Sequence, residues 1–565
     1  MLIFFSSNPK IMLLKRLNFS IRLLTVSLLC SLAPSLPVKA AEQIYLTYGP
    51  IYWSVKIASL ETFAKDGTIN QDLRTYLRGT TPEQQAQFRE ALLKRVDINP
   101  VMLSRFFNTE IGEDILTRIG KGITIEGNLN GKYALRAAIV QAALDPEGLT
   151  MLNILRKLPT DMELQGEVLL GLSQEIDKVI KATIAYSEAM ANLSAKEKEA
   201  ETPVDFTQLP DIRQPGNYGF QKEILALTDS NRNRSFYVIL YKPQRWRTGK
   251  TPVVIISHGL ASNPESFEDA AQQLASYGYV VALPQHPDSD TKQAKAFIEG
   301  YSSEVFDVQE FINRPKDISF VIDELERRNQ VEFGGRLDLE NVGVAGHSFG
   351  GYTALAVAGA IIDFDYLQKT CDRLYGGLNT SLLLQCRALS LPRQTYNFRD
   401  PRVKAVIAGN PVNSAIFGQK GLSQIQIPIF FISGNYDPAT PAVFEQLRSF
   451  VWLNTPNKYL ALAEGQAHID FSKLDAGMTQ MLDSVPNMTL PEPILLKSYL
   501  YPTFLSFFEV YLTNNLQYRP YLNASYYDYL SQKQNFKIYM ISAASESALK
   551  QDIENFRTKV GALSP

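Results

Sequence analysis

The sequence predicts an α/β protein in which a mostly parallel sheet flanked by helices follows a smaller all-α domain. Two observations carry this prediction. From residue 216 onward, short apolar runs alternate with helical stretches, which is the order of a parallel sheet with helical crossovers. Between residues 41 and 200, apolar residues recur at helical spacing instead. At 565 residues the chain is too long for one ordinary core, so two domains are expected.

Residues 1–40 have the features of a cleaved secretory leader. They contain five basic residues and no acidic one, with an apolar run from Leu23 to Leu32. Val38 and Ala40 are small residues at the two positions that a signal peptidase reads. A membrane anchor is the alternative, but the apolar run is short and is followed by two prolines. We therefore expect cleavage near Ala40 and export to the periplasm, the thylakoid lumen or the medium.

Composition and charge exclude several classes of protein. Apolar residues make up 45% and charged residues 20%, which is typical of a globular chain and not of a disordered one. Removing the five positive charges of the leader from a formal net charge of −2 leaves −7. No basic patch is visible, so we expect no nucleic-acid partner.

The region 41–200 reads as a helical domain of unknown role. Thr81-Pro82-Glu83-Gln84 gives a helix start with an N-cap, a proline at the first helical position and a capping-box glutamine. A second, longer helix carries apolar residues at helical spacing from Val168 to Ile180. Residues 201–215 are polar and contain prolines, which indicates an interdomain linker.

Strand patterns begin after Gly216. Phe220–Leu227 and Ser235–Tyr241 indicate a hairpin, and Pro252–Ser257 is a continuous apolar run typical of a strand buried on both faces. Helices are expected at 267–277 and 317–328, and further strands at 279–283, 403–408, 428–433 and 458–463. An insertion at about 363–400 falls where a cap over a site could lie, and the region from Glu492 onward reads as aromatic and helical.

The stretch Asn341–Gly351 reads N-V-G-V-A-G-H-S-F-G-G and is followed by a helix-forming run. The apolar residues predict a strand, and Gly346 and Gly350 flank Ser348 in a tight turn, where side chains would collide. A serine oxygen at such a strand-to-helix turn is exposed for attack. The stretch therefore predicts a nucleophilic serine and, with it, the α/β-hydrolase fold.

A nucleophilic serine needs a base to accept its proton. The usual order along such chains is serine, acid and then histidine. Of the four histidines, only His468 lies downstream of Ser348, and we interpret it as the base. His258, His286 and His347 are interpreted as structural residues or as residues that support the site.

The acid that orients the base is expected at Asp437. This residue follows the predicted strand 428–433 directly, which delivers its side chain to the carboxyl edge of the sheet. A surface turn is the competing interpretation. Asp400, Glu464 and Asp470 are alternative acids, but none follows a core strand so directly.

An oxyanion hole needs two backbone N–H groups. We expect one from Phe349, which follows the nucleophile, and one from Leu260, because His258-Gly259-Leu260 ends the strand next to the turn. The sequence contains no H-E-x-x-H, no C-x-x-C and no phosphate-cradling glycine loop, so no metal or organic cofactor is expected.

The stretches Gly346–Gly351 (G-H-S-F-G-G) and Ser257–Leu260 (S-H-G-L) resemble the secreted platelet-activating factor acetylhydrolases. These are α/β hydrolases that cleave short or oxidised acyl chains from phospholipids; polyester hydrolases and dienelactone hydrolases are more distant relatives. The whole chain resembles a family of exported cyanobacterial α/β hydrolases of unassigned substrate. The acetylhydrolase resemblance covers only about residues 216–515 and implies the same nucleophile, acid, base and oxyanion donors.

The expected function is therefore that of a serine ester hydrolase acting through an acyl-enzyme on short-acyl or lipid-like esters. Leu260 and Phe349 place bulky apolar groups beside the oxyanion hole, and the resemblance favours short acyl chains as well. The alternatives are a peptidase or polyester hydrolase of the same fold, or a non-catalytic binding protein that contacts a membrane surface or a partner.

The mature chain would keep two cysteines, Cys371 and Cys386, both in the insertion. Export to an oxidising compartment and an even number of cysteines predict a disulfide between them. Two buried thiols are the alternative.

Overall fold

The computed structural model describes residues 40–374, 376–468 and 491–561. Contacts divide the chain into two units. The N-terminal unit comprises Met1–Ile98 and Ile123–Leu164, and the main unit comprises Asn99–Gly122 and Gln165–Pro565. The predicted leader, except Ala40, and the alternative acid Asp470 lie outside the described residues. Among the described residues, no helix is long and apolar enough to span a membrane.

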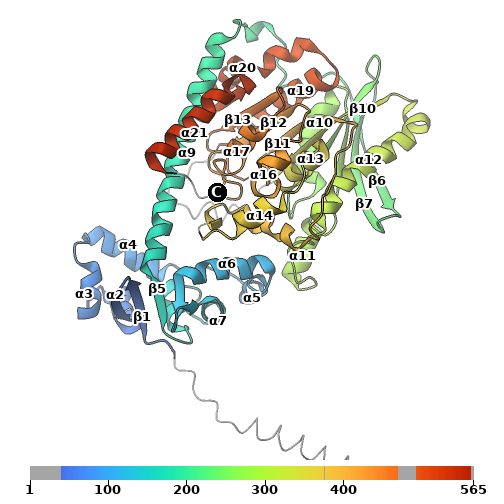
Figure 1. Cartoon of the computed structure of the whole chain (residues 1–565). Helices are drawn as coiled ribbons and strands as arrows, with labels where there is room; N and C mark the ends of the chain where they lie inside the picture. Colours follow the sequence, from blue (N-terminus) through green and yellow to red (C-terminus); the bar gives the residue numbers. More distant parts are fainter. Residues whose placement is uncertain (1–39, 375, 469–490, 562–565) are drawn as a thin grey trace, which may run out of the picture. The chain divides into compact units, whose positions relative to one another are not determined.

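The main unit is built on a nine-stranded sheet (Figure 1) with the order β14-β13-β12-β11-β10-β8-β9-β7-β6. The strands from β13 to β9 in this order are parallel, and β14, β7 and β6 are antiparallel additions at the two ends. The strands are β6 (Phe220–Asp229), β7 (Arg234–Pro243), β8 (Thr251–Ser257), β9 (Val280–Pro284), β10 (Leu337–His347), β11 (Val403–Gly409), β12 (Ile429–Gly434), β13 (Lys458–Ala463) and β14 (Ile538–Ser542).

Helices cover both faces of this sheet because alternate residues of its central strands are apolar on opposite sides. In β8, Val253 and Ile255 belong to one core cluster, and Val254 and Ile256 to the other. The first cluster is covered mainly by α9 (Gly166–Ala200), α12 (Glu310–Phe333), α13 (Phe349–Ala358), α16 (Ser414–Leu422), α17 (Gln446–Trp452) and α21 (Glu546–Val560). The second is covered by α10 (Glu268–Ser276), α19 (Pro493–Leu512) and α20 (Ala524–Ser531).

The α/β-hydrolase fold predicted from the sequence is confirmed, and the predicted strands lie within β6 to β13 with only small shifts at their ends. The predicted hairpin is the antiparallel pair β6 and β7. Sequence reasoning missed β14, which pairs with β13 in a region expected to be helical. Its five residues, I-Y-M-I-S, are too few to show a periodicity of their own.

The N-terminal unit contains helices, as predicted, but it is not all-α, because it also contains a five-stranded sheet of order β2-β1-β5-β3-β4. Gly49, with φ of 52°, turns the chain between β1 and β2, and this glycine-proline turn was the missed hairpin signal. The predicted capping box at Thr81 and Gln84 is present, with both of its hydrogen bonds. The strands are β1 (Gln43–Tyr48), β2 (Ile51–Lys56), β3 (Ile123–Ile125), β4 (Leu129–Asn130) and β5 (Met162–Gln165), and the helices are α2 (Ile57–Asp66), α3 (Gln71–Leu77), α4 (Pro82–Leu93), α7 (Lys132–Leu144) and α8 (Met151–Arg156).

The predicted boundary near residue 200 requires correction, since the long helix α9 belongs to the main unit. It runs beside α20 and α21 (Figure 1), and its Tyr186 hydroxyl lies 3.0 Å from the Ser433 hydroxyl of β12. Residues 201–215 are not an interdomain linker, because the chain on both sides belongs to the same unit. Phe206 and Ile212 are buried in the second core cluster, which anchors this segment.

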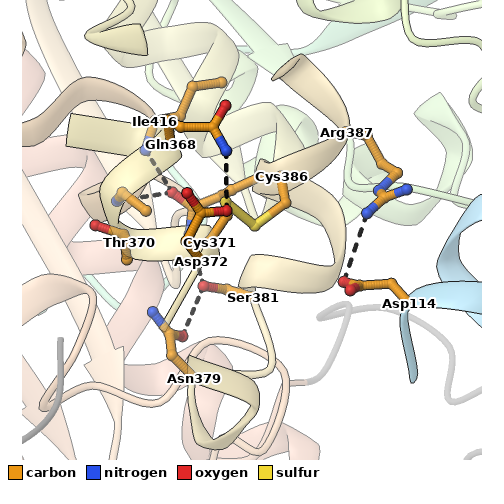
Figure 2. The surroundings of a disulfide bond; sticks show 12 residues. Asp114, Gln368, Thr370, Cys371, Asp372, Asn379, Ser381, Cys386, Arg387 and Ile416 are labelled. Carbon is orange, nitrogen blue, oxygen red and sulfur yellow. Dashed lines mark hydrogen bonds and ion pairs between the residues drawn. A yellow bond between two sulfur atoms is a disulfide. The ribbon is translucent and has the colours of Figure 1, made fainter. Parts of the chain in front are cut away.

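The insertion at 363–400 is compact and contains α14 (Phe364–Cys371) and α15 (Leu382–Gln385). A disulfide joins Cys371 to Cys386, as predicted (Figure 2). Next to it, Arg387 forms ion pairs with Glu110 and Asp114 of α6 (Glu110–Gly122), at 3.4 and 3.5 Å. The insertion is therefore tied both to itself and to a helix that precedes the sheet in the sequence.

Reduction of this disulfide is expected to destabilise the protein. A loop closed by 15 residues corresponds to about 3 kcal/mol of unfolding free energy. The intact mass of the protein should increase by two hydrogen atoms when reductant is added, and the melting temperature should fall on reduction. No mass change on reduction would contradict the bond.

Candidate active site

Ser348 lies at the turn between β10 and α13, near the centre of the sheet. Its backbone has φ of 56° and ψ of −118°, a conformation that is rare for any residue with a side chain. Its N–H donates to Gly409 O at 2.9 Å, which fixes the turn against β11. The predicted strand, turn and helix are all present, and the serine is 6% exposed.

The two glycines of G-x-S-x-G are required by close main-chain contacts. A Cβ atom at Gly346 would lie 2.0 Å from Gly350 O, and one at Gly350 would lie 2.0 Å from Ser257 O. Both obstacles are backbone atoms of the central strands and the turn. They cannot move without displacing Ser348 or the end of β8.

Gly350→Ala is therefore expected to destabilise the protein by about 3 kcal/mol or more, despite alanine's preference for helices. Gly334→Ala is the matched control: Gly334 has φ of +59°, but no atom lies within 4 Å of the position that an added methyl group would take. That control should cost only about 1–2 kcal/mol, from backbone strain alone. Denaturant titration measures both, and equal losses would contradict the steric account.

Asp437 and His468 meet Ser348 at the carboxyl edge of the sheet. Asp437 follows β12 and His468 follows β13, and both strands are parallel to β10. His468 Nε2 lies 2.9 Å from Ser348 Oγ, and His468 Nδ1 lies 2.8 Å from Asp437 Oδ2. The three side chains predicted from the sequence thus form one continuous hydrogen-bonded relay.

Asp437 is held in its ionised form by its surroundings. Its side chain is fully buried, which by itself would raise the pKa of the carboxyl. The charge and hydrogen bond of His468 and the hydrogen bonds from Thr440 outweigh burial and hold the pKa of Asp437 well below its ordinary value. The N–H groups of Ala439 and Thr440 both donate to Oδ1 at 2.8 Å.

The described alternative acids have other partners. Asp400 forms an ion pair with Arg402 at 2.7 Å. Glu464 accepts hydrogen bonds from Lys537 N, at 3.0 Å, and from the Tyr539 hydroxyl, at 3.1 Å. Neither is the carboxylate that meets His468.

The other three histidines are buried and neutral. Burial and the neighbouring His468 charge lower the pKa of His347 to about 3, and its ring lies 4.7 Å from that of His468. Burial lowers the pKa of His258 and of His286 well below the ordinary value. These residues lie around the site, and none of them occupies the position of the base at Ser348.

Leu260 and Phe349, the two expected oxyanion donors, belong to segments that lie next to Ser348. Phe349 is the first residue of α13, and Gly259, which precedes Leu260, lies beside Ser348, since a Cβ built on it would be 3.4 Å from Ser348 Cβ. Within the described part of the chain, the N–H groups of Leu260 and Phe349 make no hydrogen bond.

Sequence reasoning missed two residues that support Asp437. The Asn410 side-chain amide, at the end of β11, donates to Asp437 Oδ2, and the Thr440 hydroxyl lies 2.7 Å from the same oxygen. Thr440 stands three residues after Asp437 in an Asp-Pro-Ala-Thr turn, which is a recognisable turn signal. Asn410 has no such signal, because it reaches Asp437 from a neighbouring strand.

The described residues contain no group of three or more His, Cys, Asp and Glu side chains that could hold a metal ion. The fold and the relay together define an α/β hydrolase. Residues 40–165 match the family described as alpha/beta hydrolase of unknown function (DUF1400), and residues 209–368 match the chlorophyllase family. The second match contains Leu260, Ser348 and Phe349 and ends before Asp437. No curated protein matches the sequence. These matches support a hydrolytic enzyme of the serine-esterase type.

Proposed function

We propose that this protein is a serine ester hydrolase that works through an acyl-enzyme, with short-acyl or lipid-like carboxylic esters as substrates. The observation that carries the proposal is the relay of Ser348, His468 and Asp437, in which both hydrogen bonds are shorter than 3 Å. The match to the chlorophyllase family supports an ester as the substrate.

In the proposed mechanism, Ser348 Oγ attacks the ester carbonyl while His468 Nε2 accepts its proton. Asp437 holds the imidazole so that Nε2 faces the serine, and its carboxylate stabilises the imidazolium. The N–H groups of Leu260 and Phe349 bind the oxyanion of the tetrahedral intermediate. His468 then protonates the leaving alcohol, and a water molecule activated by the same base hydrolyses the acyl-serine.

Of the two residues that the sequence analysis used to predict a preference for short acyl chains, only Leu260 can line the acyl pocket. Phe349 is fully buried, and its ring packs against Phe311 and Phe306 at 4.9 and 5.8 Å, so it does not narrow an open acyl pocket. Leu260 is only partly buried and remains a candidate wall of that pocket. The resemblance to the acetylhydrolases supports the same preference.

Fluorophosphonate labelling tests the serine mechanism. The wild type should be labelled on Ser348 and Ser348→Ala should not, with equal melting temperatures as the control for folding. An unlabelled wild type would support the rival assignment, a binding protein that keeps the fold without the chemistry.

A substrate panel then tests the acyl preference. It contains p-nitrophenyl esters of increasing chain length, short-acyl and long-acyl phospholipids, chlorophyll and a peptide. Activity should fall beyond a few acyl carbons. In an open hydrophobic groove, each buried methylene would instead add up to about 0.8 kcal/mol of binding free energy, and long chains would be favoured. Cleavage of the peptide without ester preference would assign the protein to the peptidases of this fold.

A further inference from the structure

Arg314, on α12, is a buried arginine beside the proposed oxyanion hole. Its side chain is fully buried, and its guanidinium contacts the loop that follows β8. Arg314 Nη1 donates to His258 O at 2.6 Å, and Nη2 donates to Gly259 O at 3.2 Å. Its Nε donates to the Ser289 hydroxyl at 3.0 Å. One rigid fork of donors therefore holds two successive carbonyl groups of this loop.

The Gly259 carbonyl is held from a second direction as well. The backbone N–H of His286 donates to His258 Nε2 at 3.1 Å, so the ring proton of neutral His258 is on Nδ1. That Nδ1–H lies 2.8 Å from Gly259 O. The Gly259 oxygen thus accepts from both the guanidinium and the imidazole, which fixes the direction of its C=O bond.

The direction of this carbonyl determines the direction of the Leu260 N–H. Both groups belong to one planar trans peptide, so the N–H points opposite to the C=O. The next residue is fixed too, because Ala261 N donates to Ser289 O at 2.8 Å. Gly259 lies beside Ser348. The hydrogen bonds to the Gly259 carbonyl therefore fix the direction of the Leu260 N–H, which lies on the opposite side of the same peptide.

Arg314 also contacts the residue that supplies the second donor. The guanidinium carbon lies 4.4 Å from the centre of the Phe349 ring, a cation–π contact within the core. Burial lowers the pKa of Arg314 to about 10, with Glu310 and Asp317 opposing the fall, so the group is charged at neutral pH. The positive charge of Arg314, which lies next to the Gly259 carbonyl, also polarises this peptide, and this makes the Leu260 N–H a stronger donor.

We propose that Arg314 is a positioning residue for the oxyanion hole: by holding the carbonyls of His258 and Gly259, it aims the Leu260 N–H at the oxyanion formed on Ser348. This inference rests on the proposed function. Arg314 does not touch the substrate in this proposal. It contributes to the stability of the transition state and not to substrate binding. The step it supports is the formation of the tetrahedral intermediate from serine and ester.

Arg314→Lys tests the proposal, because lysine keeps the charge but cannot donate to two carbonyls through a planar fork. Arg234→Lys is the matched control. Arg234 is buried in the adjoining ion cluster, with Glu310 and Asp317 both at 2.9 Å, and its hydrogen bonds do not include His258 O or Gly259 O. For each variant, kcat, KM, the melting temperature and the inhibition constant of a trifluoromethyl ketone are measured. That ketone forms a tetrahedral adduct with serine.

Arg314→Lys should lower kcat by about 10- to 100-fold, with KM within about threefold of wild type, and should weaken the ketone by the same factor as kcat. Arg234→Lys should keep kcat within about threefold of the wild-type value, even if its melting temperature falls as much as that of Arg314→Lys. A kcat for Arg314→Lys near that of wild type, or an equal loss in both variants, would overturn the proposal.

Ser289→Ala serves if Arg314→Lys does not fold, since it removes the hydroxyl that accepts from Arg314 Nε and donates to Glu310 Oε2 at 2.9 Å. It should lower kcat by about five- to tenfold at constant KM, beyond the range allowed for Arg234→Lys, and a kcat within about threefold of wild type would overturn the proposal. The proposed function fails separately: a wild type that fluorophosphonate does not label removes both proposals, whereas a labelled wild type with an unaffected Arg314→Lys variant removes this one alone.

Discussion

Replacing His468 with alanine is expected to lower kcat by about 10⁶-fold, because it is the base that hydrogen-bonds Ser348 Oγ among the residues that the structure describes. His468 Nε2 is 2.9 Å from Ser348 Oγ, and the neighbouring His347 is held neutral by burial. The loss should appear in kcat, with KM nearly unchanged, because the proton transfer occurs only on the way to the transition state. Steady-state kinetics on p-nitrophenyl acetate measure it.

Non-additivity provides the control for this variant. Ser348→Ala, His468→Ala and the double variant should all retain the same residual rate, because the serine and histidine act as one unit. Melting temperatures of the three variants that equal that of the wild type exclude unfolding as the cause of the lost activity. A double variant much slower than either single variant would mean that the two residues act independently, which contradicts the relay.

Replacing Asp437 with asparagine is expected to lower kcat by about 10⁴-fold at neutral pH. The pKa of Asp437 is below its ordinary value, so the carboxylate is ionised and accepts the proton of His468 Nδ1. An amide in its place would donate toward Nδ1 and favour the tautomer with the proton on Nε2. That tautomer cannot accept the proton of Ser348.

Asp400→Asn is the control for charge removal, since Asp400 pairs with Arg402 away from the relay. It should keep kcat within about threefold of wild type. The Asp437 carboxylate also contributes stability above the ordinary pKa of a carboxyl group, and this contribution is lost as the pH falls toward its own lowered pKa. An Asp437→Asn variant with wild-type kcat would point to a different acid, Asp470 being the candidate outside the described residues.

The sequence was sufficient to predict the parts of the site that depend on local order. Gly346-x-Ser348-x-Gly350 carries its own strand, turn and helix, and its glycines meet backbone atoms as the motif requires. Asp437 and His468 could be found because each follows a buried strand and comes after the serine in the chain. Parallel strands bring their carboxyl ends to one edge, so chain order translates into proximity.

The parts that sequence reasoning missed depend on contacts between distant segments. Asn410 meets Asp437 from the adjacent strand, and Arg314 reaches the loop after β8 from a helix 55 residues further on. An arginine or asparagine in the sequence gives no sign of being buried. The N-terminal boundary failed for a similar reason, because residues 99–122 belong to the main unit although 123–164 do not. Phe349 was assigned correctly by position, but its ring lies in the core.

The central claim is that the reaction passes through an acyl group on Ser348, and trapping that group tests it most directly. Protein turning over p-nitrophenyl acetate is quenched with acid within the first turnover, and its intact mass and peptides are measured. We predict a burst of p-nitrophenol, with one acetyl group per chain on the peptide that contains Ser348 and none in Ser348→Ala. Hydrolysis without a burst and without an acetylated serine, or an acetyl group on any other residue, would contradict the account.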